Sequence, residues 1–288
     1  MLKIHITGGN GGVGSALSKA LVQNGAQLIR AKNTALRIQA DAYYEQFDNP
    51  EEIDLIYHLA AISFVPDSWE NPARFIEINV LGTTKVLEFC RKYNIRLVYV
   101  SSYAYGTPQY LPIDENHPVS TSNPYGLSKI MGEELCTFYG DHYDLSYLIV
   151  RPFNVFGMLK NNKLLIPEII EQLEKGERIK VKDLSPKRDC VYIDDLIRFL
   201  VLAAENTNNQ IYNVGGGSSY SVAEIIAICQ DVWGTNLPVE SAEIERKNEI
   251  PETLCNNNKA KIDLGWEPEF TFKEGINAIK NRLANQSN

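Results

Sequence analysis

The sequence predicts an α/β fold in which a doubly wound parallel sheet is accompanied by a smaller C-terminal lobe. Three observations support this prediction. Short apolar runs alternate with longer amphipathic stretches through the first half of the chain, and a glycine-rich loop directly follows the first apolar run. After about residue 157 the regular alternation ends, and helical patterns with polar, proline-containing connections follow. Alternating strands and helices imply right-handed crossovers and a sheet that is covered on both faces.

The elements of the first half can be assigned in order. The first apolar run, Lys3–Thr7, has the length and alternation of a strand, and the helix after the loop is predicted at Val13–Asn24 because Gly25 is a natural C-cap. Length and composition predict further strands at Ala26–Ala31, Leu36–Ala40, Asp54–Leu59, Arg96–Ser101 and Ser146–Arg151. Helical periodicity predicts the intervening helices at Asn71–Tyr93 and Tyr125–Tyr139.

The second half has a different organisation. Amphipathic patterns predict helices at Ile166–Lys175, Ile193–Glu205, Val222–Trp233 and Phe272–Leu283, with a short strand at Ile211–Gly215. We therefore expect residues 1–157 and about 189–214 to form the sheet domain, and about 158–188 and 215–288 to form the smaller lobe.

Composition and charge limit the function classes. The chain has 288 residues, 44% hydrophobic and 22% charged, which is typical of a folded protein, and its net charge of −8 argues against a nucleic-acid partner. No apolar run approaches the roughly 18 residues that span a bilayer, and MLKIHITGG leads directly into a strand. The five scattered cysteines contain no Cys-x-x-Cys, and the four histidines have no metal-binding spacing. We expect a reduced, cytoplasmic protein with neither a metal site nor a membrane partner.

The glycine-rich loop Gly8-Gly-Asn-Gly-Gly-Val-Gly14 is the first candidate binding site. Gly8 permits a tight turn, Gly11 lets the backbone approach a pyrophosphate, and Gly14 lets the helix pack close to the sheet. The helix N-terminus adds amide donors and a positive dipole end. With a strand before it and a helix after it, the loop is typical of a Rossmann dinucleotide-binding fold rather than of a turn without a ligand.

The end of the second predicted strand bears on the choice of dinucleotide. Dinucleotide folds that bind NAD usually place an acidic residue there, about 20 residues after the loop. This chain has Arg30 and Lys32 instead, which favours the 2′-phosphate of NADP and leaves NAD as the alternative. The two cations could also be a solvated strand end. Asp41 could accept a hydrogen bond from the adenine amino group or serve as a turn residue.

A catalytic group is predicted from Tyr125 and Lys129, which are spaced i and i+4 and therefore share one face of a helix. An ammonium beside a phenol would favour phenolate and lower the tyrosine pKa toward neutrality. Such a tyrosine can act as a general acid or base on an alcohol or ketone. Ser101 and Ser102 end the strand before this helix, and a serine there can hydrogen-bond the same substrate oxygen.

Taken together, these motifs and further segments make the chain resemble the extended short-chain dehydrogenase/reductase family, in its sugar-nucleotide epimerase/dehydratase group. The resemblance covers almost the whole chain and keeps the family's order. It is carried by TGGNGGVG, DLIYHLAA, INVLGTTKVLEFC, VYVSSYAYG, PYGLSK, RPFNVFG, RDCVYIDDL, IYNVGGGSSYSV and LGWEPEFTFKEG.

The resemblance implies catalytic and cofactor-binding roles. Tyr125 would be the acid/base and Lys129 would hold the nicotinamide ribose. Counting from the strand makes Ser102 the catalytic serine, whereas counting back from Tyr105 gives Ser101; we choose Ser102. The full set of expected cofactor-binding residues is Gly8, Gly11, Gly12, Val13, Arg30, Lys32, Asp41, Leu59, Ala60, Ala61, Asn79, Ser101, Pro152 and Phe153.

The resemblance also implies a nucleoside-diphosphate sugar as substrate, clamped by the smaller lobe. Asn154 and Arg188 would grip the diphosphate, the arginine through its fork geometry, although Arg188 could instead form a structural ion pair with Asp189. The other expected substrate-binding residues are Tyr103, Leu165 and Tyr192. His58 is interpreted as a packed strand residue rather than as a catalyst.

Three further features separate the members of the group. Family dehydratases carry Asp-Glu after the catalytic serine, and here Tyr103-Ala104 follow, which argues against a dehydratase. A 4-keto reductase and a 4-epimerase remain; Arg30 and Lys32 favour the reductase, and the 4-epimerase is the alternative. The intact tyrosine, lysine and serine argue against a non-catalytic NAD(P) sensor.

The helices at Asn71–Tyr93 and Tyr125–Tyr139 match the family's dimer-forming pair, so a homodimer is expected.

Overall fold

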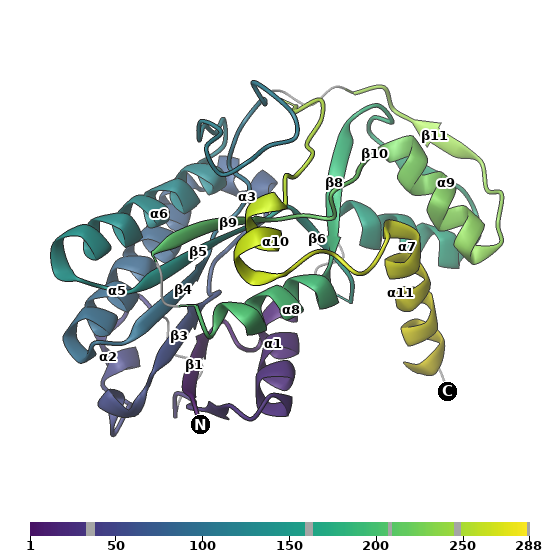
Figure 1. Ribbon diagram of the computed structural model, residues 1–288. Helices are drawn as coiled ribbons and strands as arrows, with labels where there is room; N and C mark the ends of the chain where they lie inside the picture. Colours follow the sequence, from purple (N-terminus) through teal and green to yellow (C-terminus); the bar gives the residue numbers. More distant parts are fainter. Residues whose placement is uncertain (33–37, 159–163, 207–208, 245–248, 287–288) are drawn as a thin grey trace. The chain divides into compact units, whose positions relative to one another are not determined.

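The computed structural model describes residues 1–32, 38–158, 164–206, 209–244 and 249–286 (Figure 1). Contacts within the chain divide it into two compact units. The first unit comprises Met1–Gly106, Pro118–Pro152 and Ile197–Tyr212, and the second comprises Thr107–His117, Phe153–Leu196 and Asn213–Asn288.

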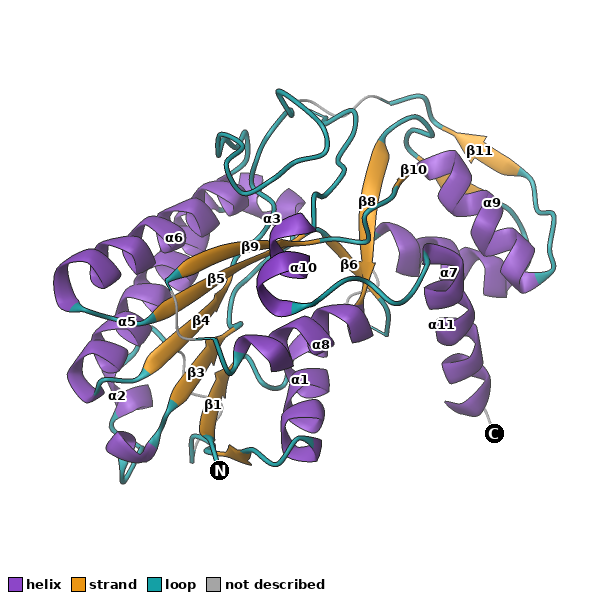
Figure 2. Cartoon of the chain, in the orientation of Figure 1, coloured by secondary structure: helices purple, strands orange, loops and turns teal. Residues whose placement is uncertain are grey.

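A six-stranded sheet forms the centre of the first unit (Figure 2). Its strands are β1 (Lys3–Thr7), β2 (Gln27–Leu28), β3 (Leu55–His58), β4 (Arg96–Val100), β5 (Tyr147–Pro152) and β9 (Gln210–Val214). They lie in the order β2-β1-β3-β4-β5-β9, and β1 pairs in parallel with both β2 and β3. The strand order therefore reverses at β1, and the carboxyl end of β1 is the position where open α/β sheets bind ligands. This arrangement confirms the predicted doubly wound parallel sheet.

Helices accompany this sheet in the first unit, and several of them pack on it. They are α1 (Gly12–Gln23), α2 (Asp41–Tyr44), α3 (Val65–Glu70), α4 (Pro72–Phe75), α5 (Gly82–Tyr93), α6 (Pro124–Tyr143) and α8 (Ile193–Ala203), with a short 3₁₀ turn at Pro50–Glu52. The helix α1 packs on β1 and β2, whereas α5 packs on β3 and β4, and α6 lies beside α5 on β5. The sheet extends from β1 to β2 on one side and from β1 through β3, β4 and β5 on the other. Because the crossover connections are right-handed, α1 lies on one face of the sheet, and α5 and α6 lie on the opposite face. No helix in the described residues has both the length and the apolar character needed to cross a bilayer.

The region after β2 departs from the sequence prediction. The strand β2 is only Gln27–Leu28, and no strand is found at Leu36–Ala40: residues 36 and 37 lie outside the described part, and Ile38–Ala40 form a turn into α2. The strand prediction is thus wrong for residues 38–40. The buried side chain of Ile38 packs in a small cluster with Ala31 and Tyr43. Its apolar character therefore reflects this cluster and not a pleated sheet.

The helical stretch predicted at Asn71–Tyr93 is present but is not one uniform helix. Between α4 and α5 it passes through a π-helical segment, Ile76–Leu81. The Asn71 side chain caps α4 by accepting from the Arg74 amide at 3.3 Å. The π-helical segment contains Asn79, whose side chain is buried. Short π-helical segments of this kind occur often at functional sites.

The second unit has two small sheets and its own aromatic core. Its elements are β6 (Asn154–Phe156), α7 (Leu165–Lys175), β7 (Ile179–Val181), β8 (Lys187–Tyr192), β10 (Ser219–Ser221), α9 (Val222–Trp233), β11 (Val239–Ser241), α10 (Asn258–Leu264) and α11 (Phe272–Gln286). The sheet β10-β8-β6 carries Tyr192, which packs against Phe156 and Phe270. The predicted domain limits placed residues 189–196 with the large sheet, whereas contacts group β8 and the first turn of α8 with the second unit.

Candidate active site

The glycine-rich loop forms a closely packed turn at the carboxyl end of β1. Gly8 has a φ of +74°, and a Cβ there would lie 2.8 Å from the Ala60 backbone nitrogen. A Cβ on Gly14 would lie 2.3 Å from the Gly8 carbonyl oxygen. Gly11, with an ordinary φ of −71°, is the N-cap of α1 and supplies no capping side chain. The loop therefore requires glycine at positions 8 and 14 and leaves backbone donors at the start of α1 for an anion.

The segment after β3 lies against this loop. The Leu59 amide donates to the Thr7 carbonyl at 3.2 Å, and the Ala60 amide donates to the Thr7 hydroxyl at 3.3 Å. The structure thus brings Leu59 and Ala60, both expected at the cofactor, next to Gly8. Ala61 follows them and is partly buried.

The hydroxyl groups of Ser102 and Tyr125 form a hydrogen bond. Tyr125 is held at the start of α6, where Asn123 caps the helix by accepting from the Gly126 amide at 2.8 Å and Pro124 occupies the first turn. The neighbouring Ser101 has a buried hydroxyl with no hydrogen-bond partner in the described residues. Of the two candidate serines, the structure therefore joins Ser102 to the tyrosine.

Lys129 lies one turn after Tyr125, but its effect on the tyrosine differs from the prediction. Burial raises the pKa of Tyr125, and the bond from Ser102 offsets this only in part. The expected lowering toward neutrality is therefore wrong for the protein as described. The Lys129 ammonium lies 4.3 Å from the centre of the Tyr99 ring, and burial lowers the Lys129 pKa to about 8.

Asn79 has a positioning role in this structure. Its amide oxygen accepts from the Ile62 backbone nitrogen at 3.0 Å, and its amide nitrogen donates to the Ile62 carbonyl and to the Ser128 hydroxyl. Ser128 in turn donates to the Tyr125 carbonyl at 2.7 Å. Both amide hydrogens of Asn79 are used within the protein, so it links the segment after β3 to the turn of α6 that carries the tyrosine. The contact with a cofactor that the resemblance implies for Asn79 would therefore have to use its side-chain amide oxygen.

His58 is buried in a second polar chain. Its ring nitrogens contact the Thr7 hydroxyl at 2.7 Å and the Thr83 hydroxyl at 2.9 Å. Burial, reinforced by the nearby Lys129 charge, lowers the pKa of His58 to about 3. The ring is therefore neutral at physiological pH, in agreement with its interpretation as a packed strand residue.

The expected dinucleotide-selecting residues lie on the surface after β2. Arg30 is exposed, and Lys32 forms an exposed ion pair with Asp48 at 2.6 Å. Asp41 pairs with Lys85 at 2.7 Å instead of being a simple turn residue. Exposed pairs of this kind contribute about 0–1 kcal/mol, so both lysines can exchange partners readily.

The expected diphosphate-binding residues lie in the second unit. The Asn154 amide donates to the Asp189 carbonyl at 2.8 Å. Arg188 forms an ion pair with Glu249 and donates to the Ile250 carbonyl, so the alternative of a pair with Asp189 is wrong. The Asp189 carboxylate instead accepts from three backbone amides, those of Gly216, Gly217 and Cys255.

The remaining candidates differ in accessibility. Tyr192 is only 1% exposed and its hydroxyl has no partner in the described residues, so here it is a core residue rather than a pocket wall. Leu165 is partly buried at the start of α7. The Tyr103 amide donates to the Pro152 carbonyl at 3.3 Å, which keeps these two residues together in the first unit. Phe153 is buried in the second unit, and its amide donates to the Val214 carbonyl.

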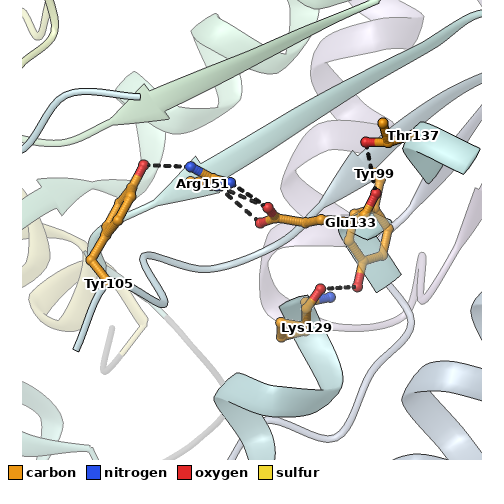
Figure 3. A network of polar contacts seen from close by, with 6 residues as sticks. All are labelled: Tyr99, Tyr105, Lys129, Glu133, Thr137 and Arg151. Atoms are coloured by element: carbon orange, nitrogen blue, oxygen red, sulfur yellow. Dashed lines mark hydrogen bonds and ion pairs between the residues drawn. The ribbon is translucent and has the colours of Figure 1, made fainter. Parts of the chain in front are cut away.

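A buried ion pair was not anticipated from the sequence. Arg151, at the end of β5, donates to both carboxylate oxygens of Glu133 on α6 and to the Tyr105 hydroxyl (Figure 3). A signal for Glu133 was available, because it continues the four-residue spacing of Tyr125 and Lys129. Arg151 begins the segment RPFNVFG, where no local pattern points to its distant partner.

Comparisons with known proteins identify the family of this chain. The profile of the NAD dependent epimerase/dehydratase family matches residues 4–215. A UDP-glucose 4-epimerase of Halalkalibacterium halodurans is 30% identical, with 95% of this chain and 92% of the relative covered. A GDP-6-deoxy-D-mannose reductase of Pseudomonas aeruginosa is 29% identical over 80% of each chain.

A solved structure shares the fold over the full length. The UDP-glucose 4-epimerase of Thermotoga maritima, determined with UDP-glucose, superposes with a TM-score of 0.91 at 25% identity and covers 100% of both chains. The family profile covers well over half of this chain and includes the glycine loop, Ser102, Tyr125 and Lys129. The chain therefore belongs to the NAD-dependent epimerase/dehydratase family of extended short-chain dehydrogenases/reductases, and it is an enzyme.

Proposed function

We propose that this enzyme is a nucleoside-diphosphate-hexose 4-epimerase that works by reversible hydride transfer at carbon 4 of the sugar. The hydrogen bond between Ser102 and Tyr125 supports proton and hydride transfer at a sugar carbon. The observation that favours the epimerase is the similarity to a UDP-glucose 4-epimerase over 95% of this chain, compared with 80% for the reductase. Ser102 follows β4 and the glycine loop follows β1. Carboxyl ends of parallel strands lie at one edge of a sheet, so the hydroxyl pair and the dinucleotide loop share that edge.

The residues of the loop fit a dinucleotide. A side chain at position 8 or 14 would collide with backbone, and the N-cap at Gly11 leaves amides available for a pyrophosphate. Lys129, whose ammonium is buried on the face of α6 below Tyr125, is the residue proposed to hold the nicotinamide ribose. When bound, the nicotinamide would supply and accept the hydride.

Tyr125 and Ser102 would handle the proton. Because burial raises the pKa of Tyr125, its hydroxyl is protonated at neutral pH and can donate to an oxygen at carbon 4 as negative charge develops there. Ser102 would hydrogen-bond the same oxygen. In the opposite direction Tyr125 must lose its proton, and a cationic Lys129 nearby would favour the phenolate. Epimerisation needs both directions, with the sugar presenting opposite faces.

A 4-keto reductase is the second candidate, favoured by Arg30 and Lys32 after β2, where an acidic residue would suit NAD. The same hydroxyl pair would serve it, but reduced cofactor would be consumed. The distinguishing experiment incubates the purified enzyme with UDP-glucose and follows the sugar by NMR. An epimerase produces the C4 epimer without net change in nicotinamide absorbance. Failure to form the epimer, together with NADPH consumption on a 4-keto sugar nucleotide, would replace the proposal with the reductase.

Cofactor preference gives a prediction of its own, because NADP is the proposed dinucleotide. Replacing Arg30 and Lys32 together with alanine is expected to weaken NADPH binding by about tenfold or more, since each hydrogen bond from a cation to phosphate contributes roughly 1.5–3 kcal/mol. Binding of NADH should change little. Fluorescence titration of both dinucleotides measures this, with Lys92→Ala as a control for charge loss on an exposed helix end. If the double variant weakened the binding of NADH and NADPH equally, Arg30 and Lys32 would not contact the 2′-phosphate.

A homodimer formed through α5 and α6 is also part of the proposal. The two helices pack side by side, and the outer surface of α6 exposes apolar side chains, including Leu127, Phe138 and Tyr143. Phe138→Glu is expected to shift the protein from dimer to monomer in light scattering after size-exclusion chromatography, because it introduces a charge into an apolar contact. Ile262→Glu, at an 81% exposed apolar residue of α10, is the matched control. A wild-type monomer would rule out this interface.

A further inference from the structure

A group of buried charges lies along one face of α6. Lys129 and Glu133 are spaced i and i+4, and both are at most 5% exposed. Arg151 on β5 is 4% exposed, and its Nε and Nη2 donate to the Glu133 carboxylate at 3.0 and 2.5 Å (Figure 3). The Glu133 carboxylate is thus bonded to Arg151, and the Lys129 side chain starts one helical turn before it on the same buried face of α6.

We infer that Glu133, held in place by Arg151, is a positioning residue that keeps Lys129 cationic and orients the segments that carry the active hydroxyls. The inference rests on the proposed function, because it assigns a task to Lys129. We propose no contact of Glu133 or Arg151 with substrate or cofactor. Both would affect turnover indirectly, through the charge of Lys129 and the positions of Tyr105 and the ends of the strands.

The charge argument begins with the surroundings of Lys129. Burial favours its neutral amine and lowers its pKa to about 8, and the Glu133 carboxylate opposes that effect. The titratable and charged groups around Lys129 are Tyr125, Glu133 and Cys136 on α6, His58 on β3 and Tyr99 on β4, with Arg151 on β5 bonded to Glu133. Of these, Glu133 is the only carboxyl group. Its loss would leave the ammonium without a buried counter-charge.

The geometric argument concerns three segments. The carboxylate anchors α6, which carries Tyr125 and Lys129. Arg151 lies on β5 directly before Pro152. Its guanidinium donates to the Tyr105 hydroxyl at 2.8 Å, and Tyr105 belongs to the loop that also carries Ser102. Buried ion pairs are often no more stable than apolar packing of the same volume, so stability alone does not account for a charged pair at this point.

The test measures the charge of Lys129 directly. Glu133→Gln removes the charge and keeps the shape, and the titration of Lys129 is followed by NMR of protein labelled at the lysine ε-carbons, with the Lys129 signal assigned by its loss in Lys129→Met. The midpoint is expected to fall by about one pH unit or more. Glu134→Gln, the same change at the exposed neighbouring residue, should leave the midpoint in place. An unchanged midpoint in Glu133→Gln overturns the inference.

Turnover provides the second measurement. Since Lys129 would then lose its proton at lower pH, the alkaline limb of the kcat profile of Glu133→Gln should move to lower pH by the same amount, with the KM for nucleotide sugar nearly unchanged. Glu133→Asp keeps the charge and should retain the wild-type profile even if it unfolds at a lower temperature. A uniform loss of kcat at every pH in Glu133→Gln would make the pair merely structural.

The proposed function and this inference can fail separately. If the wild-type enzyme turns over no nucleotide sugar, the proposed function fails, while the NMR titration still decides whether Glu133 sets the charge of Lys129. Tyr105→Phe removes one bond to Arg151 and leaves the ion pair intact. It should preserve the Lys129 midpoint and lower kcat by a few-fold, which separates the orienting contribution from the charge contribution.

Discussion

Phenylalanine in place of Tyr125 is expected to lower turnover of the nucleotide sugar by about 10²- to 10⁴-fold. The change removes only the hydroxyl that is bonded to Ser102, while the ring can keep its edge-on contact with Phe75, 6.4 Å between centres. Dinucleotide binding depends on the glycine loop and should remain within a few-fold of wild type. Initial rates of C4 epimer formation and a fluorescence titration with dinucleotide measure the two properties in the same preparation.

Tyr143→Phe is the matched control for that experiment. Tyr143 ends the same helix, is 48% exposed and has a ring beside the Arg91 guanidinium, a contact that phenylalanine preserves. The control should turn over at the wild-type rate. If Tyr125→Phe also retained turnover within a few-fold of wild type, another group would have to move the proton, and the assignment of Tyr125 would be withdrawn.

Alanine at Gly14 is the second change with a large expected effect. Its Cβ would lie 2.3 Å from the Gly8 carbonyl oxygen and 2.8 Å from the Gly9 Cα, both backbone atoms that cannot rotate away. We expect the free energy of unfolding to fall by about 1–3 kcal/mol through overpacking. Displacement of the loop should also remove amide contacts to the pyrophosphate, and losing one of these alone weakens binding by roughly 10- to 100-fold. Thermal unfolding and dinucleotide titration measure the two effects.

Gly11→Ala separates binding from stability. Gly11 has an ordinary φ, and its added Cβ would lie 3.2 Å from the Gly8 carbonyl oxygen, a contact that a small shift relieves. The variant should therefore unfold near the wild-type temperature but bind dinucleotide more weakly, because the methyl group occupies the approach to the backbone. Normal dinucleotide affinity in both variants would show that this loop does not hold the pyrophosphate.

The predictable part of the site depends on local signals. The glycine loop, and the four-residue spacing of Tyr125 and Lys129, each lie within one short segment, so the sequence alone specifies their geometry. The choice between Ser101 and Ser102 needed the structure. Adjacent residues of an extended chain point to opposite sides, and only the orientation of the chain end relative to α6 decides which hydroxyl meets the tyrosine.

The unpredicted part depends on contacts between distant segments. Glu133 and Arg151 are 18 residues apart and meet only because α6 packs on β5. Arg188 finds its carboxylate partner 61 residues later, in Glu249 rather than in the adjacent Asp189. The direction of the Tyr125 pKa shift was also beyond sequence reasoning, since the spacing showed a nearby cation but could not show how deeply both groups are buried.

The π-helical segment at Ile76–Leu81 restricts how the length of this region can change. A π-turn holds one residue more than an α-turn, so the side chains before and after it are offset by about 100° compared with a regular helix. Deleting one residue would restore a regular helix but rotate α4 relative to α5 by that angle. Asn79 could then no longer reach Ile62 and Ser128 while Val86 and Leu87 stayed in the core. In descendants of this chain, the gain or loss of a single codon within the segment is therefore incompatible with this arrangement of Asn79 and the core.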